Sequence, residues 1–127
     1  MRRSSFAVLA CSLALLGGCG ITGACTLIGC ESGLFVQLAG TPAGAYRVEA
    51  IGAGNEVLHA VNCPSAEGCA GGAVFRDFFP ASVTIRVTTA AGTTTQSFQP
   101  TYTDSQPNGP NCPPTCRQGS VTVALPG

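Results

Sequence analysis

From residue 33 onward, apolar and polar residues alternate along the chain with a period of two. The clearest runs carry their apolar residues at Leu34-Val36-Leu38, Tyr46-Val48-Ala50, Val83-Ile85-Val87 and Val121-Val123-Leu125. Polar residues such as Arg47, Glu49 and Arg86 lie between them. This alternation is typical of strands that bury one face and expose the other.

Glycine and proline separate these runs, as in the turn at Thr41-Pro42-Ala43-Gly44. The pattern predicts seven strands, at residues 34–38, 46–50, 56–61, 73–79, 82–89, 93–102 and 119–125. Pro100 places the far end of the sixth strand at an edge or a bulge. We therefore expect an all-β fold, a single seven-stranded antiparallel β-sandwich.

The N-terminus follows a different pattern. Arg2 and Arg3 precede an apolar run of eleven residues, Phe6–Leu16, which is too short for a bilayer core that needs about 20 residues. This is the pattern of a secretory signal peptide. Leu16-Gly17-Gly18-Cys19 resembles the lipobox of bacterial lipoprotein signals, Leu-x-Gly/Ala-Cys. The resemblance implies cleavage before Cys19, its lipidation, and attachment to the extracytoplasmic face of a membrane of the cell envelope.

Two other processing sites are open. Leu27-Ile28-Gly29-Cys30 is a second match to the lipobox, and an ordinary signal peptidase could cut after Ala24. With Cys19 as the first mature residue, the predicted boundaries are a signal peptide at 1–18, a lipidated tether at 19–31 and a disulfide-stapled β-sandwich domain at 32–127.

Size and charge limit the possible functions. Removing 18 of the 127 residues leaves 109, enough for one small domain with one core. The chain has no lysine, and without Arg2 and Arg3 it keeps four arginines against six acidic residues, a formal charge of −2. Nucleic acid is therefore not an expected partner, because no basic stripe is available for its phosphates.

Six cysteines remain after Cys11 leaves with the signal peptide and Cys19 takes lipid: Cys25, Cys30, Cys63, Cys69, Cys112 and Cys116. An even number in an exported chain predicts disulfides, and six cysteines allow 15 pairings. Cys63 and Cys69 flank a short loop and could close it. Zinc is the competing interpretation, because the sequence spacings Cys25-x4-Cys30 and Cys112-x3-Cys116 fall near those of zinc ligands.

The segment Pro42-Ala43-Gly44-Ala45-Tyr46-Arg47-Val48 resembles the Pro-x-Gly-x-Tyr-x-Val hairpin of bacterial carboxypeptidase-regulatory-like and prealbumin-like sandwiches, and residues 79–85 have a similar pattern. These domains are mostly structural or binding modules. In immunoglobulin-like sandwiches the first and last strands can run parallel, side by side. That arrangement implies disulfides between Cys25 and Cys112 and between Cys30 and Cys116.

Three features of the sequence are candidate sites that also suit purely structural roles. His59, the only histidine, is expected to be an exposed strand residue. Arg76-Asp77 lies among aromatic residues; we expect Phe75 and Phe79 in the core, whereas an exposed Phe78 beside Tyr102 would indicate a recognition patch. Residues 104–110 contain oxygen ligands, but Asn108-Gly109 between prolines is more typical of a rigid turn than of a calcium loop.

The chain is therefore expected to be a membrane-anchored lipoprotein without catalytic residues, metal or cofactor. Its predicted role is to bind a protein or a glycan of the envelope, or to serve as a structural part. The alternative is a small-ligand or metal-binding envelope protein that uses the cysteine-rich end and the proline loop.

Overall fold

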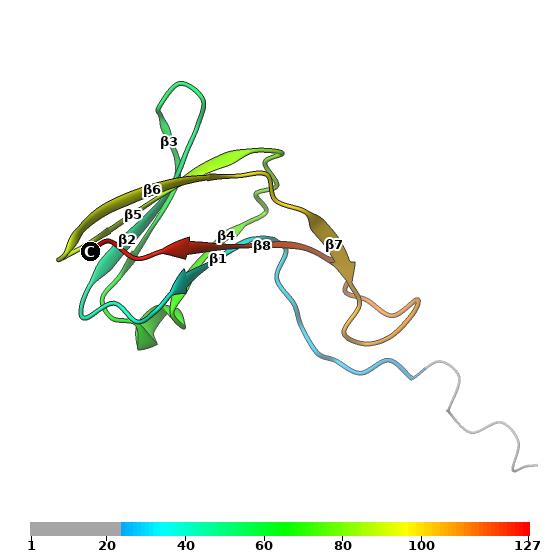
Figure 1. The fold of residues 1–127 in the computed structure, drawn as a ribbon. Coiled ribbons are helices and arrows are strands. Elements are labelled where there is room, and N and C mark those ends of the chain that lie inside the picture. Colours follow the sequence, from blue (N-terminus) through cyan, green and yellow to red (C-terminus); the bar gives the residue numbers. More distant parts are fainter. Residues whose placement is uncertain (1–23) are drawn as a thin grey trace, which may run out of the picture.

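The computed structural model describes residues 24–127, which form an all-β fold of two four-stranded sheets (Figure 1). The strands are β1 (Gly33–Ala39), β2 (Tyr46–Ile51), β3 (Val57–Cys63), β4 (Gly72–Arg76), β5 (Val83–Thr89), β6 (Gly92–Phe98), β7 (Tyr102–Ser105) and β8 (Cys116–Ala124), with a 3₁₀ turn at Glu67–Cys69. One sheet has the order β4-β1-β8-β7 and the other β3-β2-β5-β6. In the described part of the chain, no helix is long and apolar enough to cross a membrane.

The prediction of seven strands is wrong, because the predicted sixth strand is two strands in different sheets. β6 ends at Phe98 beside β5, and the chain resumes at Tyr102 as β7, beside β8. Pro100 lies between them and has no N–H to donate to a ladder. The chain therefore leaves one sheet at this proline and enters the other.

The fourth strand is also shorter than predicted. β4 ends at Arg76, and Asp77 has a positive φ of 52°. The Asp77 N–H donates to the Ser32 carbonyl at 2.9 Å. A left-handed residue cannot continue the pleat, so Phe78 and Phe79 lie in the loop that leads to β5.

The first and last strands pair in parallel, as the immunoglobulin-like resemblance implied. The predicted label of an antiparallel sandwich is therefore wrong for this one pairing. Along β1 and β8, Leu34 is opposite Gly119, Val36 is opposite Val121 and Leu38 is opposite Val123. The other pairings in both sheets are antiparallel. Parallel pairing puts the beginning of β1 and the beginning of β8 at the same end of the molecule (Figure 1).

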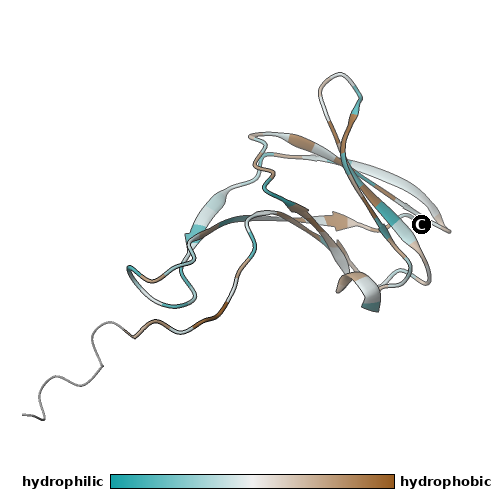
Figure 2. Ribbon diagram, turned by 180° about the vertical axis from the view of Figure 1, so that it is seen from behind, coloured by the Kyte–Doolittle hydropathy of each residue, from teal (hydrophilic) through white to brown (hydrophobic). Residues whose placement is uncertain are grey.

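One core lies between the two sheets. It is built from the inward residues of both, chiefly Leu34, Val36, Phe75, Val121 and Val123 from one sheet and Val48, Ala50, Ile85 and Val87 from the other. The Tyr46 hydroxyl on β2 donates to the Gly72 carbonyl on β4 at 2.8 Å and so joins the sheets. The alternation of apolar and polar residues is visible along the strands in Figure 2.

Phe75 is the largest fully buried side chain of this core, and its replacement tests the packing. We expect Phe75→Ala to lower the free energy of unfolding by about 3–5 kcal/mol, because it removes a ring that the two sheets enclose. Urea denaturation at neutral pH measures the change. Phe79→Ala is the matched control: Phe79 is 39% exposed and should cost about 1 kcal/mol or less. Equal losses for the two variants would contradict the described core.

Candidate functional site

Within residues 24–127, three disulfides join the six cysteines: Cys25 to Cys112, Cys30 to Cys116 and Cys63 to Cys69, with Cα–Cα distances of 5.6, 6.1 and 5.8 Å. The pairs match those predicted from the resemblance and from the short loop. None of these sulfurs is a thiolate, so the cysteine-rich end supplies no zinc ligand. Cys19 lies outside the described residues, and its lipidation stays a prediction.

Asn108 connects the loop after β7 to the segment before β1. Its Oδ1 accepts hydrogen bonds from the Thr26 hydroxyl and, at 2.8 Å, from the Ile28 N–H. Its Nδ2 donates to the carbonyls of Ile28 and Pro113, both at 2.8 Å. The amide thus pairs with Ile28 as a neighbouring strand would. The predicted rigid turn therefore holds the N-terminal segment.

His59 lies on β3, an edge strand, with an exposed side chain. Its ring centroid is 4.4 Å from that of Phe78 and 5.7 Å from that of Phe75. Phe78 is half-buried against the core and does not form the exposed patch beside Tyr102. The aromatic residue beside Tyr102 is Phe79, at 5.6 Å, so the prediction that Phe79 is in the core is wrong.

Arg117 on β8 lies over both of these rings, its Cζ 5.7 Å from the centroid of Phe79 and 5.5 Å from that of Tyr102. The Tyr102 hydroxyl donates to the Pro80 carbonyl at 2.7 Å, and burial raises the pKa of this hydroxyl. These contacts attach β7 to the loop between β4 and β5. Because the Arg117 guanidinium and the Tyr102 hydroxyl are both engaged in these contacts, we assign a structural role to the group formed by Phe79, Tyr102 and Arg117.

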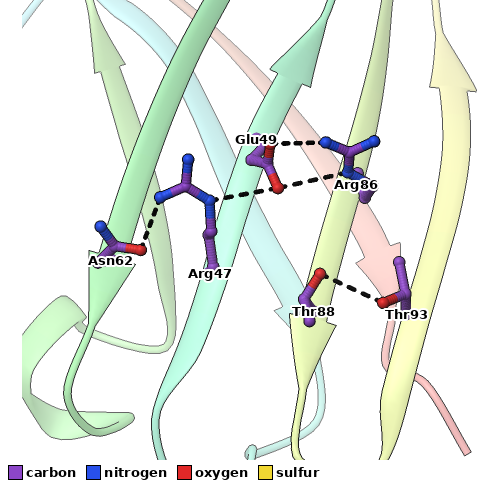
Figure 3. Close-up of polar contacts among 6 residues, drawn as sticks. All are labelled: Arg47, Glu49, Asn62, Arg86, Thr88 and Thr93. Carbon is purple, nitrogen blue, oxygen red and sulfur yellow. Dashed lines mark hydrogen bonds and ion pairs between the residues drawn. The ribbon is translucent and has the colours of Figure 1, made fainter. Parts of the chain in front are cut away.

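The most developed polar arrangement is a cluster on the outer face of the sheet β3-β2-β5-β6 (Figure 3). Glu49 is the centre of this arginine cluster, which consists of Arg47, Glu49 and Arg86. Arg86 donates from Nε and Nη2 to the two carboxylate oxygens of Glu49, at 3.3 and 2.7 Å. Arg47 pairs with Oε1 from the other side at 3.3 Å, and its Nη1 donates to the Asn62 Oδ1 at 2.9 Å.

The register of the strands creates this cluster. Glu49 is opposite Arg86 across the β2–β5 ladder, and Arg47 is two residues from Glu49 on the same face of β2. Their side chains cover the carboxylate, leaving the Glu49 side chain only 8% exposed although it faces away from the core. The hydrogen bond from Arg86, then the positive charges of Arg86 and Arg47, hold the pKa of Glu49 below its ordinary value, against the opposing effect of burial.

The two guanidinium groups remain accessible, with side chains 41% exposed for Arg47 and 34% for Arg86. The carboxylate fixes their positions, and the cluster keeps a net charge of +1. Each guanidinium has more N–H donors than these contacts use, so the outer face presents oriented donors to an incoming anion.

A shallow groove of about 500 Å³ lies at the end of the same sheet. The groove is lined in part by Ile51, two residues from Glu49 on β2, and by Thr84, two residues from Arg86 on β5. Ser97 and Phe98 of β6 also line it. The hydroxyls of Thr84 and Ser97 are 2.9 Å apart. The groove thus offers hydroxyl and apolar contacts within a short reach of the guanidinium groups.

A second groove, of about 450 Å³, lies on the outer face of the other sheet. Its lining is uncharged: Phe35, Gln37, Thr101, Thr103, Gln118, Gly119 and Ser120. Among residues 24–127, no group of three or more potential metal-ligating side chains occurs in either groove or elsewhere.

Comparison of the chain with protein-family models, curated proteins and solved structures finds no match. Sequence alternation places Arg47 and Glu49 on one face, but it does not pair them with Arg86, which is far away along the chain. Only the register between β2 and β5 brings the three together.

Replacing Glu49 tests whether it organises the cluster. We expect Glu49→Gln to lower the free energy of unfolding at pH 7 by about 1–3 kcal/mol, because an amide leaves two guanidinium groups without a charged partner. The pKa of Glu49 is lowered by folding, so its contribution is fully present above the unfolded pKa, near 4.3, and is lost as the pH falls through the folded pKa. Denaturant titrations from pH 7 to pH 3 should show the two proteins converging at low pH.

Glu67→Gln is the matched control, since Glu67 is an exposed residue of the 3₁₀ turn. It should change stability by about 0.5 kcal/mol or less at neutral pH. A Glu49→Gln difference that stays constant down to pH 3 would show that the carboxylate charge is not what stabilises the cluster.

Proposed function

We propose that this chain is a lipoprotein of the bacterial cell envelope, anchored through lipidated Cys19 on the extracytoplasmic face of a membrane. Its folded part is proposed to be an immunoglobulin- or prealbumin-like β-sandwich that binds, without catalysis, carboxylate groups of an envelope glycan or protein. The arginine cluster is the observation that carries the binding role.

The anchoring proposal is supported by the lipobox at Cys19 and by the disulfide framework. Buried acyl carbons contribute about 0.8 kcal/mol per methylene, so two or three chains hold a protein stably. The paired cysteines fit an exported chain, because disulfides persist in oxidising compartments.

The binding proposal is supported by the distribution of charge. The mature chain carries a net charge of −2, yet two of its four arginines lie together on one sheet face. Guanidinium groups bind carboxylates through paired N–H donors, and the two side chains are already held in position by Glu49. Less conformational entropy is therefore lost on binding than with free arginine side chains.

A non-catalytic role suits the same geometry. The only carboxylate of the arginine cluster has a lowered pKa and is committed to two guanidinium groups. A general base works best with a pKa close to the working pH, so Glu49 is poorly suited to remove protons. The cluster is suited to hold an anion in place.

The uncharged groove favours a second candidate function, the binding of a small neutral ligand such as a sugar. Phe35 offers a ring face, and Gln37, Gln118 and the neighbouring hydroxyls offer hydrogen bonds. Binding there would be insensitive to changes in the arginine cluster on the other sheet.

Arg47→Gln tests the carboxylate-binding role. We expect it to weaken binding to a uronic-acid polysaccharide or an acidic peptide roughly tenfold, because a charged hydrogen-bond donor is lost. Calorimetry or surface binding measures the affinity, and a carboxyl-reduced polysaccharide should not bind. Arg76→Gln is the matched control: Arg76 is exposed and pairs with a glutamate, Glu31, at 2.6 Å, but lies on the other sheet. Equal effects of the two substitutions would reduce the proposal to non-specific charge attraction.

Cys19 tests the anchor. The intact mass of the protein from the membrane fraction should correspond to a chain that begins at Cys19 with its acyl chains attached. Cys19→Ser should abolish the acylated form. An unmodified mass beginning at Cys25 would show that an ordinary signal peptidase cuts after Ala24, and an acylated chain beginning at Cys30 would move the anchor to the second lipobox.

A further inference from the structure

Residues 24–30, here called the N-terminal strap, expose two adjacent apolar side chains. Leu27 is 99% exposed and Ile28 is 55% exposed, the two highest values among the large apolar residues described. Figure 2 shows the strap as a brown segment that extends away from the sheets. In water these two side chains do not gain the favourable free energy of burial. Exposed apolar surface of this kind marks a place where another surface binds.

The strap is held rigidly in this position. The disulfides of Cys25 and Cys30 fasten it on both sides of Leu27 and Ile28, and Asn108 binds the backbone of Ile28 through both its N–H and its carbonyl. The strap therefore cannot fold back onto the core without breaking these contacts.

The strap and the loop that it contacts carry no charged side chain. Neither the strap nor residues 105–116, which it contacts, contains Asp, Glu, Arg or His. Three ionic groups adjoin these segments along the chain: Glu31 pairs with Arg76, Arg117 lies over two aromatic rings, and the exposed Asp104 is opposite Arg117 in the β7–β8 ladder. An uncharged surface with exposed leucine and isoleucine can approach lipid without the large cost of burying an ion.

The segment between the proposed anchor, Cys19, and the strap is short enough to keep the strap near the anchoring membrane. Six Cα–Cα steps separate Cys19 from Cys25, which span at most about 20 Å. From this we propose that Leu27 and Ile28 insert into the interfacial layer of the bilayer and fix the orientation of the domain. This proposal rests on the proposed lipid anchor and names a second, non-covalent contact with the same membrane.

Insertion of this kind has a distinct signature. It depends on buried apolar area and not on attraction to anionic headgroups, because the strap has no cationic residue. Contact with the membrane should therefore be the same on zwitterionic and anionic vesicles and should persist in high salt.

The absence of tryptophan from the chain allows a direct test. Leu27→Trp places the only tryptophan on the strap, in the lipidated protein reconstituted into phosphatidylcholine vesicles with or without phosphatidylglycerol. We expect its emission to shift to the blue and to be quenched by brominated acyl chains. Ala91→Trp is the control, on the exposed β5–β6 turn at the opposite end of the molecule (Figure 1), and should behave as a solvated tryptophan. Solvated emission from Trp at both positions would overturn the proposal, as would quenching that requires anionic lipid and is lost in salt.

The mature chain with Ser in place of Cys19, exported behind an ordinary signal peptide, separates this proposal from the anchor. If Leu27 inserts, the unlipidated Leu27→Trp protein still shows a blue shift at high lipid concentration, and Leu27→Asp lowers the partitioning of the unlipidated chain roughly tenfold or more. Failure of lipidation at Cys19 would leave this result intact. Unchanged partitioning of Leu27→Asp would contradict insertion even if Cys19 is lipidated.

Discussion

The parallel pairing of β1 with β8 is the constraint on which the rest of the structure depends. It joins the beginning of the domain to its last strand and brings Cys30 within disulfide distance of Cys116. The second disulfide, Cys25 to Cys112, and the Asn108 amide extend the same junction toward the N-terminus. One end of the molecule is thereby held rigidly and lies a few residues from the predicted anchor. The sheet that carries the arginine cluster does not take part in this junction.

The all-β class could be predicted because alternation along a strand is a local property. Val83, Ile85 and Val87 face the core and Arg86 faces out, as period two requires. The strand count was not predictable in the same way. Pro100 is compatible with an edge, a bulge or an interruption, and only the packing of Tyr102 against Gly119 shows that the chain changes sheets there. Phe78 and Phe79 are adjacent, and a single left-handed residue, Asp77, decides which of them packs against the core.

The candidate site could be predicted less well than the fold, because it depends on contacts between distant parts of the chain. Glu49 meets Arg86 only through the register of β2 and β5, and Asn108 meets Ile28 only because the loop after β7 is stapled beside the strap. The predicted lipobox at Cys19, by contrast, is a local pattern that a peptidase would recognise in an extended chain. The proposed location thus depends on a local sequence pattern, whereas the proposed binding depends on the geometry of the arginine cluster.

Disulfide mapping tests the central junction most directly. Cleavage of the non-reduced protein after arginine and glutamate leaves Cys25 and Cys30 on one peptide and Cys112 and Cys116 on another. The described junction predicts that these two peptides remain joined by two bonds, which fragmentation by electron transfer should assign as Cys25–Cys112 and Cys30–Cys116. Separate peptides, with Cys25 bonded to Cys30 and Cys112 bonded to Cys116, would contradict the stapled parallel pairing and the rigid strap that follows from it.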